Sequence, residues 1–508
     1  MRKRKTPLPV ILDTISFSNA LRNMPMLLQL LEPGQSINET TSPHKVAIGI
    51  DLGTTHSLVA MVKDGKPVTL TLTHGRVLMP SAVYTQDGHV LTGHEALEKG
   101  AQNPAALLTS FKRFMGDAKH PEENKDALYA SAKILACLKR RAEEALGHDV
   151  SRAVITVPAY FSEAARSATR QAAQLAGLEV LRLVSEPTAA ALAYGLEKSA
   201  QGLYLVYDLG GGTFDVSLLR LEAEVFQVIG TAGDTNLGGD TFDALLAAHL
   251  EPGFGDMDVP LQKNCMRRMR ALREALSQET HVSYGAQTLT RDQLEALIAP
   301  HVEHTLNLVE HVLSEAHVEA SALQGIILVG GATRTPLIGK SLEARSPAPV
   351  LADMDPDHVV AWGAALQAHA LSGGTGPLLM DVLALSLGLE TMGGGVEVLL
   401  PRNSPLPISK TQSFTTFQDG QSAILIHVVQ GEAQNAKDCR TLTRFEVSGL
   451  PLVPAGMVRL QVRFTMDVDG LLTITAKEKS QELFQEVSLK PTHGLSLDDM
   501  VALLARNG

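Results

Sequence analysis

Two glycine-rich segments of this chain carry residue types that could hold a phosphate group. The later one, residues 208–215, reads Asp-Leu-Gly-Gly-Gly-Thr-Phe-Asp. Its three consecutive glycines allow a tight turn whose backbone N–H groups face an anion, and Thr213 offers a hydroxyl. The carboxylates of Asp208 and Asp215 suit Mg²⁺, which proteins usually hold through one or two carboxylates together with phosphate oxygens and water. A single run of this kind is more often an ordinary glycine turn.

An earlier segment repeats the pattern. Residues 48–57 include Asp51, Gly53, Thr54 and Thr55, again directly after an apolar run typical of a buried strand. The pattern of a strand, then Asp-Leu-Gly, then glycine or threonine thus occurs twice. Its duplication predicts two related half-domains that face one nucleotide. The duplication therefore favours a nucleotide site over two unrelated turns.

Three further segments could contribute to such a site. Gly330 and Gly331 follow a strand-like run and would let a base or ribose approach closely, while the guanidinium of Arg334 could stack on the base. An isolated Gly-Gly is also a simple strand-to-helix turn. Glu186 begins a predicted helix, where it could reach metal-bound water or only interact with the helix N-terminus. Lys112 could act as a point charge near the transferring phosphoryl group, although by itself it would be a surface lysine.

Length, charge and cysteine content narrow the class of protein. A chain of 508 residues predicts two to four domains. The net charge of −11 argues against duplex nucleic-acid binding, and no apolar run approaches the ~18 residues of a membrane span. Cys137, Cys265 and Cys439 are odd in number and lack Cys-x-x-Cys spacing, so we expect neither a disulfide framework nor a zinc site. A reducing cytoplasm is the expected location.

The first residues resemble the basic start of a signal peptide, but the apolar stretch after them is short and interrupted by prolines. We therefore do not expect export. Met24 or Met26 could equally be the true start. Residues 1–43 are predicted to be a flexible extension that leads to the first strand.

From Val46 to about Ala370 the sequence alternates strand-like and helix-like runs, as an α/β domain does. The predicted strands are 47–50, 57–62, 153–157, 203–207, 216–219, 226–231 and 325–329. The predicted helices are 126–146, 161–176, 186–196 and 240–250. Pro187 suits the first turn of the third of these helices.

After Ala370 the composition changes. Residues 372–377 are rich in glycine and indicate a linker, and the apolar run from Leu378 to Leu383 should need a docking surface. Short strands at close spacing then predict an antiparallel sandwich, at 396–400, 413–417, 422–430, 443–447, 458–467, 471–476 and 484–489. The predicted domains are an extension at 1–43, a nucleotide-binding domain at 44–372, a linker at 373–385, a sandwich at 386–492 and a helical remnant at 493–508.

Several of these motifs together resemble the seventy-kilodalton heat-shock chaperone family. They are the Asp51 and Asp208 loops, 155–161, 186–191, 233–240 and 385–394, and the likeness covers roughly residues 46 to 500. Residues 27–34, 414–420 and 438–442 resemble the branch of the family that serves iron–sulfur cluster assembly. The resemblance implies an α/β actin-like ATPase domain of two pseudo-symmetric lobes, followed by an all-β sandwich that binds an extended peptide.

The resemblance also implies roles for individual residues in binding ATP and Mg²⁺. Lys112 would be the catalytic lysine, and the carboxylates of Asp51, Glu186, Asp208 and Asp215 would position Mg²⁺ and the attacking water; Asp51, Glu186 and Asp208 would hold the metal mostly through water. Thr213, grouped with these catalytic residues, would hold phosphates together with Thr55. The remaining nucleotide-binding residues would be Gly53, Thr54, Thr55, Gly210, Gly211, Gly212, Gly238, Gly239, Arg273, Ser277, Gly330, Gly331, Arg334 and Asp357. Arg273 stands where the family usually has lysine.

In the sandwich, the resemblance implies a peptide groove at Leu389, Thr391, Met392, Phe417, Ile424, Ile426 and Leu460, with Met392 and Phe417 arching over the bound backbone. Such a groove binds extended segments by strand-like hydrogen bonds. The implied partners are a J-domain co-chaperone and an iron–sulfur scaffold protein or other unfolded segments, with no nucleic acid and no membrane. Arg182 and Asp381 match positions where the J-domain acts, and Pro158 and Arg166 match positions that relay the nucleotide state to the linker.

The chain departs from the family pattern at several points. His56 and Ser185 replace asparagines, and the segment between Gly116 and Tyr129 is short, which puts the seat of Lys112 in doubt. The sequence ends at Gly508, so we expect the helical lid of the family to be missing and bound peptide to exchange quickly. Two alternatives stay open: a degenerate nucleotide- or peptide-binding protein with impaired cycling, and a small-molecule kinase of the same ATPase fold. The kinase would need neither the linker nor the sandwich.

Overall fold

The computed structural model describes residues 46–71, 75–117, 119–198, 201–222, 225–376, 378–478 and 484–487. Of these, residues 196–198, 378 and 484–487 are described by their backbone alone. The predicted N-terminal extension at 1–43 and the helical remnant at 493–508 lie outside the described residues. Among those that are described, no helix is both long and apolar enough to cross a membrane.

The first lobe is built on a sheet with the strand order β3-β2-β1-β8-β9, to which β4 adds beside β2. Strand β1 pairs antiparallel with β2 and parallel with β8. Its first Asp-Leu-Gly loop is therefore the turn between β1 and β2. The strands are β1 Ala47–Leu52, β2 His56–Lys63, β3 Lys66–Thr69, β4 Met79–Pro80, β8 Arg152–Val157 and β9 Glu179–Ser185.

The second lobe repeats this arrangement in the sheet β16-β15-β10-β11-β12-β17. Strand β10 pairs antiparallel with β11 and parallel with β15, as β1 does with β2 and β8. The glycine loop at 210–213 joins β10 to β11, so the two loops occupy equivalent positions. The strands are β10 Gly202–Leu209, β11 Phe214–Leu221, β12 Val225–Asp234, β15 Leu323–Val329, β16 Val350–Leu351 and β17 Leu378–Met380.

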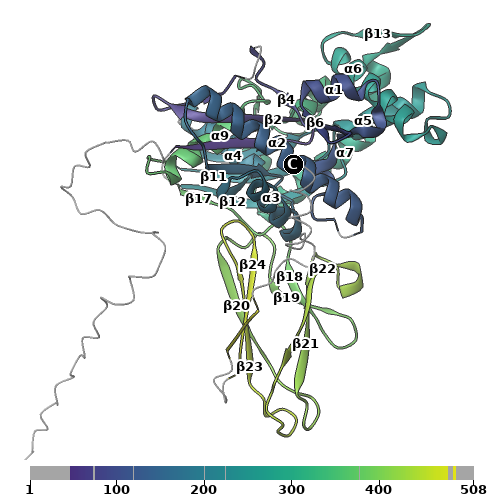
Figure 1. Cartoon of the computed structure of the whole chain (residues 1–508). Coiled ribbons are helices and arrows are strands. Elements are labelled where there is room, and N and C mark those ends of the chain that lie inside the picture. The colour runs from purple at the N-terminus through teal and green to yellow at the C-terminus, as the bar shows by residue number, and fades with distance from the viewer. Residues whose placement is uncertain are drawn as a thin grey trace, which may run out of the picture. The chain divides into compact units, whose positions relative to one another are not determined.

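Two helices, α4 Glu186–Lys198 and α9 Val359–Leu371, pack between the sheets, because their alanine-rich faces share one apolar core with residues of both. The outer face of the first sheet is covered by α2 Pro121–Leu146 and α3 Glu163–Leu175. The outer face of the second is covered by α5 Gly239–Leu250, α6 Val259–Gln278, α7 Arg291–Glu315 and α8 Pro336–Arg345. Figure 1 shows this layered arrangement around the labels α4 and α9.

Smaller strands, a short helix and 3-10 turns lie outside the two main sheets. Ahead of the shortened segment, the first lobe carries a three-stranded sheet of β5 Ala82–Gln86, β6 His89–Thr92 and β7 Leu107–Thr109, with the helix α1 His94–Gly100. The 3-10 turns are η3 Pro104–Ala106, η4 Phe111–Phe114, η5 Phe254–Asp256, η6 Ala320–Ala322, η7 Gly331–Arg334 and η8 Ala436–Asp438. The hairpin of β13 His281–Tyr284 and β14 Gln287–Thr290 follows α6.

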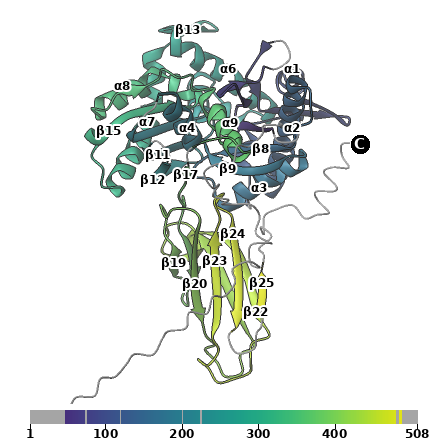
Figure 2. The ribbon, with the colours of Figure 1, turned by 90° about the vertical axis from the view of Figure 1, so that its left-hand side faces the viewer.

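The C-terminal part is a sandwich of two antiparallel four-stranded sheets, β19-β18-β21-β22 and β20-β23-β24-β25. Both sheets contribute to a single apolar core. Figure 1 shows β20, β23 and β24 on one side of the sandwich and β18, β19, β21 and β22 on the other, and Figure 2 shows the sandwich turned by 90°. The strands are β18 Leu387–Glu390, β19 Val396–Leu400, β20 Ile408–Phe414, β21 Ala423–Gln430, β22 Arg440–Ser448, β23 Leu460–Met466, β24 Leu472–Glu478 and β25 Phe484–Val487.

Most predicted strands are present, with differences of a few residues at their ends. The strand predicted at 413–417 is wrong in position, since β20 ends at Phe414 and residues 415–417 continue as irregular chain. Strand β18 was not predicted, because a four-residue run is too short to show an alternating pattern. The apolar run after the linker docks as expected, because β17 adds to the second lobe beside β12 as a parallel edge strand.

Candidate functional site

A cavity of about 710 Å³ is lined by both glycine loops and is the candidate nucleotide site. Its wall contains sixteen of the residues predicted from the sequence: Asp51, Gly53, Thr54, Thr55, Glu186, Asp208, Gly210, Gly211, Thr213, Gly239, Arg273, Ser277, Gly330, Gly331, Arg334 and Asp357. Segments as far apart in the sequence as Asp51 and Asp357 thus meet at one cavity, because the two sheets present their loops to it.

The two loops touch each other directly. A Cβ atom on Gly211 would collide with the side chain of Thr55, and one on Gly212 would lie 2.9 Å from Cγ2 of Thr54. A Cβ on Gly238 would lie 2.6 Å from the carbonyl oxygen of Gly211. Glycine is therefore needed where the loops close on each other. Gly212 and Gly238 allow this close packing but do not themselves line the cavity.

Lys112 lies behind the cavity wall and is well seated, contrary to the doubt raised by the short segment that follows it. Its Nζ donates to Oε1 of Glu186 at 2.6 Å, and only 2% of its side chain is exposed. The η4 turn that carries Lys112 packs against α2, so the shortened segment has not displaced it. Glu186 in turn lines the cavity at the start of α4.

The acidic residues of the site crowd together in a buried environment. Burial, followed by the charge of Glu186, raises the pKa of Asp51 and of Asp215 to about 7. The same two causes raise the pKa of Asp208 well above its ordinary value. Asp51 accepts a hydrogen bond from Thr156 at 3.0 Å, whereas Asp215 accepts from the backbone N–H of Tyr160 at 2.9 Å and does not line the cavity.

This arrangement fits a divalent cation. Oδ2 of Asp208 is buried without a hydrogen-bond partner, and four carboxylates share a single amine, Lys112. Within the described part of the chain, no three His, Cys, Asp or Glu side chains are close enough to ligate one metal ion directly. The residues therefore suit a cation held mostly through water and phosphate oxygens, with Asp51, Glu186 and Asp208 nearest to it.

The opposite end of the cavity is lined by arginines that are already paired. Arg273 donates to Asp243 at 2.6 Å, and Arg334 donates to Asp357 at 2.6 Å and to Asp355 at 3.0 Å. These ion pairs hold the guanidinium planes in fixed positions, which suits stacking on a base.

Sequence reasoning missed several residues of the cavity. Arg270 lines it one helical turn before Arg273 and pairs with Asp240 at 2.5 Å. The i, i+3 spacing on α6 could have indicated this arginine. His56 also lines the cavity, and burial together with the charge of Arg270 lowers its pKa. The Thr156 hydroxyl that contacts Asp51 comes from β8 and carried no sequence signal.

Comparison with known proteins identifies the family. A family model described as Hsp70 protein matches residues 47–130 and 118–507. The chain belongs to the Hsp70 family. It is 47% identical over 521 residues to the chaperone protein HscA homolog of Bordetella petrii, covering 94% of this chain and 83% of that protein. It is 46% identical to the HscA homolog of Burkholderia thailandensis, with the same coverage of both chains.

Hsp70 proteins are ATPases, so membership of the family makes ATP the nucleotide of this chain. It also agrees with the observed order of a two-lobed α/β part and a β-sandwich. The kinase alternative is disfavoured, because the match extends through the sandwich.

The residues predicted at an Hsp70 peptide groove divide into two sets. Met392 and Phe417 are 91% and 67% exposed, and Thr391 is exposed beside them. The other four are buried in the core of the sandwich: Leu389, Ile424, Ile426 and Leu460. In this structure the exposed set alone is available to a ligand.

The residues predicted to relay the nucleotide state lie where the ATPase part meets the linker and sandwich. Arg182 donates to the carbonyl of Leu379 in β17 at 3.2 Å. Arg166 is buried and donates to the carbonyl of Ala159 at 3.1 Å and to that of Asp469 in the sandwich at 3.3 Å. Pro158 is buried in the strand-to-helix turn just before Ala159, and Asp381 follows β17 and caps the N–H of Val382 at 2.9 Å.

Proposed function

We propose that this chain is an ATP-dependent chaperone that binds an extended segment of a client protein under the control of ATP hydrolysis. The observation that carries the proposal is the contact between the two glycine loops, with the Lys112–Glu186 ion pair directly behind them. Loops in this arrangement leave space for phosphates on one side and a fixed cation on the other. Hydrolysis of a phosphoanhydride needs little beyond such positioning and charge stabilisation.

Different residues would bind the phosphates, orient the attacking water and stabilise the developing charge. Backbone N–H groups of Gly53, Gly210 and Gly211 would hold phosphate oxygens, and the hydroxyl of Thr213 would orient the attacking water. Lys112, kept in place by Glu186 at 2.6 Å, would offset the charge that develops on the phosphoryl oxygens. A bound Mg²⁺ near Asp208 would supply further charge neutralisation.

Coupling to the sandwich is supported by the contacts of the linker. Strand β17 extends the second sheet, and Arg182 holds its Leu379 carbonyl. Arg166 joins the turn at Ala159 to the Asp469 loop of the sandwich. A change of lobe angle on hydrolysis would therefore act on both the linker and the sandwich. A J-domain co-chaperone acting at Arg182 and Asp381 would accelerate that change.

The client is proposed from similarity to HscA homologs, which suggests a short extended segment of an iron–sulfur scaffold protein. The exposed Met392 and Phe417 offer apolar contact for such a segment. Strand-like hydrogen bonds would supply the remaining affinity and would favour unfolded over folded clients.

Steady-state ATP turnover with Mg²⁺, measured alone and then with purified J-domain co-chaperone and iron–sulfur scaffold protein, tests the proposal. We expect the two partners together to stimulate turnover synergistically. Phe417→Ala should reduce stimulation by the scaffold, whereas Leu425→Ala, which removes an apolar side chain that is 68% exposed but outside the predicted groove, should not. Basal turnover that ignores both partners would refute the client assignment, and no turnover would indicate a degenerate binding protein.

A further inference from the structure

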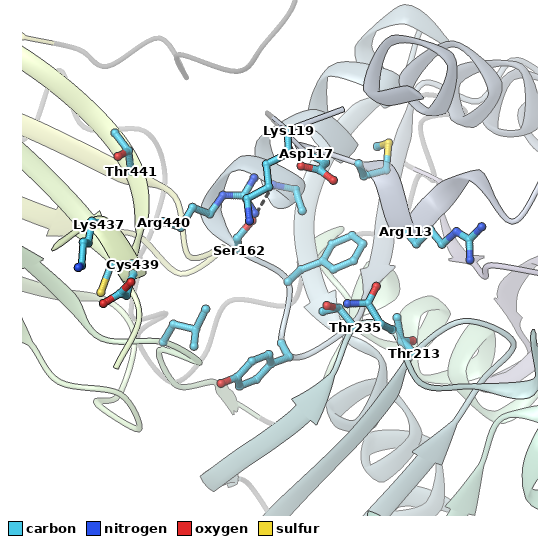
Figure 3. Close-up of a pocket in the computed structure, with 17 residues that line it drawn as sticks. Arg113, Asp117, Lys119, Ser162, Thr213, Thr235, Lys437, Cys439, Arg440 and Thr441 are labelled. Carbon is cyan, nitrogen blue, oxygen red and sulfur yellow. Dashed lines mark hydrogen bonds between the residues drawn. The ribbon is translucent and has the colours of Figure 1, made fainter. Parts of the chain in front are cut away.

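A second cavity, of about 840 Å³, shares the phosphate-loop residue Thr213 with the nucleotide cavity. One wall is formed by Tyr160, Phe161 and Ser162 of the ATPase part, and the opposite wall by residues 437–441 of the sandwich. Figure 3 shows Thr213 and Thr235 at one side of this cavity and Cys439, Arg440 and Thr441 at the other. The cavity therefore extends from the phosphate loop to the sandwich.

Two residues that line the second cavity also contact residues of the predicted catalytic set. Nζ of Lys112 lies 5.6 Å from the ring centroid of Phe161, and the backbone N–H of Tyr160 donates to Asp215 at 2.9 Å. Tyr160 and Phe161 both line the second cavity. Tyr160 and Phe161 therefore lie between the predicted catalytic residues Lys112 and Asp215 and the second cavity.

The lining of the second cavity has a cationic excess. Four cationic residues line it, namely Arg113, Lys119, Lys437 and Arg440. Two acidic residues, Asp117 and Asp438, line it as well. Asp117 already pairs with His120 at 2.8 Å, and Arg440 donates to the carbonyl of Gly116. An excess of positive charge on low-dielectric walls concentrates small anions.

The geometry of phosphoryl transfer determines on which side of the nucleotide the released phosphate would lie. In phosphoryl transfer the attacking water and the leaving group lie roughly in line on opposite sides of the phosphorus. With the nucleoside at Arg273 and Arg334, as the proposed function has it, the leaving group would lie toward these arginines and the attacking water toward Thr213. Free phosphate formed there would have the nucleoside diphosphate between it and the first opening.

We propose that the second cavity is a transient binding site and exit route for inorganic phosphate, which leaves past Tyr160 and Phe161 while the nucleoside diphosphate stays bound. This inference rests on the proposed ATPase function. Arg166 ties the carbonyls of Ala159 and Phe161 to Asp469 of the sandwich. The rate of phosphate release should therefore respond to the sandwich as well as to the nucleotide.

Cys439 gives a direct way to test the route in the full-length chain. It lines the second cavity and is partly exposed, whereas Cys137 and Cys265 are buried. Thiol reagents of matched size can therefore attach a sulfonatoethyl or a trimethylammonioethyl group at this position. Cys439→Ser treated with the same reagents is the control.

A single turnover of ATP with Mg²⁺ is followed by acid quench for diphosphate formation and by a fluorescent phosphate sensor for release. We expect the sulfonate adduct to delay release about fivefold relative to the ammonium adduct, since like charge repels the anion. Diphosphate formation should be equal in both. If phosphate release keeps pace with diphosphate formation in both adducts, the exit route is overturned but the ATPase function is not. If the unmodified chain forms no diphosphate, the ATPase function is overturned as well.

A binding measurement provides an independent test. With nucleoside diphosphate bound, millimolar inorganic phosphate should slow the labelling of Cys439 by a neutral thiol reagent, compared with sodium chloride at equal ionic strength. Arg440→Gln should remove this protection, and Arg459→Gln, a change at a sandwich arginine outside the cavity lining, should retain it. Equal labelling with phosphate and chloride would contradict a phosphate site.

Discussion

The two lobes use the same strand arrangement but pack their central helices onto it differently. In the first lobe Gly49 of β1 faces α9, and a Cβ there would collide with the backbone of Ala365. The equivalent residue of the second lobe, two positions before Asp208, is Val206, which is fully buried among side chains. The duplicated loops therefore rest on a backbone-to-backbone contact in one lobe and on side-chain packing in the other.

The lobes also supply different chemistry to the shared cavity. The first provides Asp51 and, behind the wall, Lys112, and the second provides Thr213, Asp208, Arg273 and the Gly330–Gly331 turn. Equivalent loops thus do not mean equivalent functions. The asymmetry gives predictions that differ between the lobes, the largest of which concerns the lysine.

Lys112→Ala should lower hydrolysis by about 10²–10³-fold, because it removes the predicted catalytic amine and leaves Glu186 unpaired. ATP binding should persist, since Lys112 is not part of the cavity wall. Single-turnover hydrolysis and nucleotide titration would measure the two effects. Lys133→Ala, at a lysine that stacks on Tyr129 in the same lobe, should leave both unchanged. Normal turnover in Lys112→Ala would show that the first lobe does not supply the catalytic charge.

Gly49→Ala should destabilise the chain by about 3 kcal/mol, since the added methyl group has to displace the backbone of α9. Val206→Ala should cost less, about 2 kcal/mol, because it removes two buried methyl groups without a clash. Chemical denaturation of each variant would compare the lobes. Gly339→Ala on α8, where the methyl group has open space, should stabilise by about 0.5–1 kcal/mol. A mild effect at Gly49 would refute the close helix contact.

The first lobe meets the sandwich through a titratable group. Burial raises the pKa of Glu163 to about 7, with Arg440 and Asp467 facing it. Because the pKa of this carboxyl is higher when the first lobe and the sandwich are docked, the docked state binds more protons than the undocked state. Docking is therefore strongest at low pH and weakens as the pH rises from about 4.5 to 7. Small-angle scattering at pH 5.5 and pH 8 should show more separated domains at pH 8. Glu163→Gln should lose this dependence; a variant that still responds would exclude Glu163 as its source.

The second lobe meets the sandwich through contacts of a different kind. Arg402 donates to the carbonyl of Thr231 at 3.0 Å and pairs with Glu315 at 3.1 Å. This pair is partly exposed, so Arg402→Ala should weaken docking by about 1 kcal/mol or less. The loss should shrink with added salt but not depend on pH between 5.5 and 8. A pH-dependent loss would mean that both lobes use the same type of contact.

The sequence determined the parts of this protein that depend on local chemistry. The Asp-Leu-Gly loops, the strands on either side of them and the helices at 126–146 and 186–196 follow from glycine turns and apolar periodicity. The motifs also carried the family resemblance that the comparison with known proteins confirmed. Each of these signals lies within a few consecutive residues, which is why one sequence was enough to read them.

Only the tertiary structure decided which distant groups meet. Neither the seat of Lys112 against Glu186 nor the contact of Thr156 with Asp51 has a sequence signal, because each joins residues on different elements. The pairing of β17 with β12 and the sharing of Thr213 by two cavities likewise depend on how whole layers pack. Local sequence sets the shape of each loop, but long-range packing sets the distances and burial on which charge stabilisation depends.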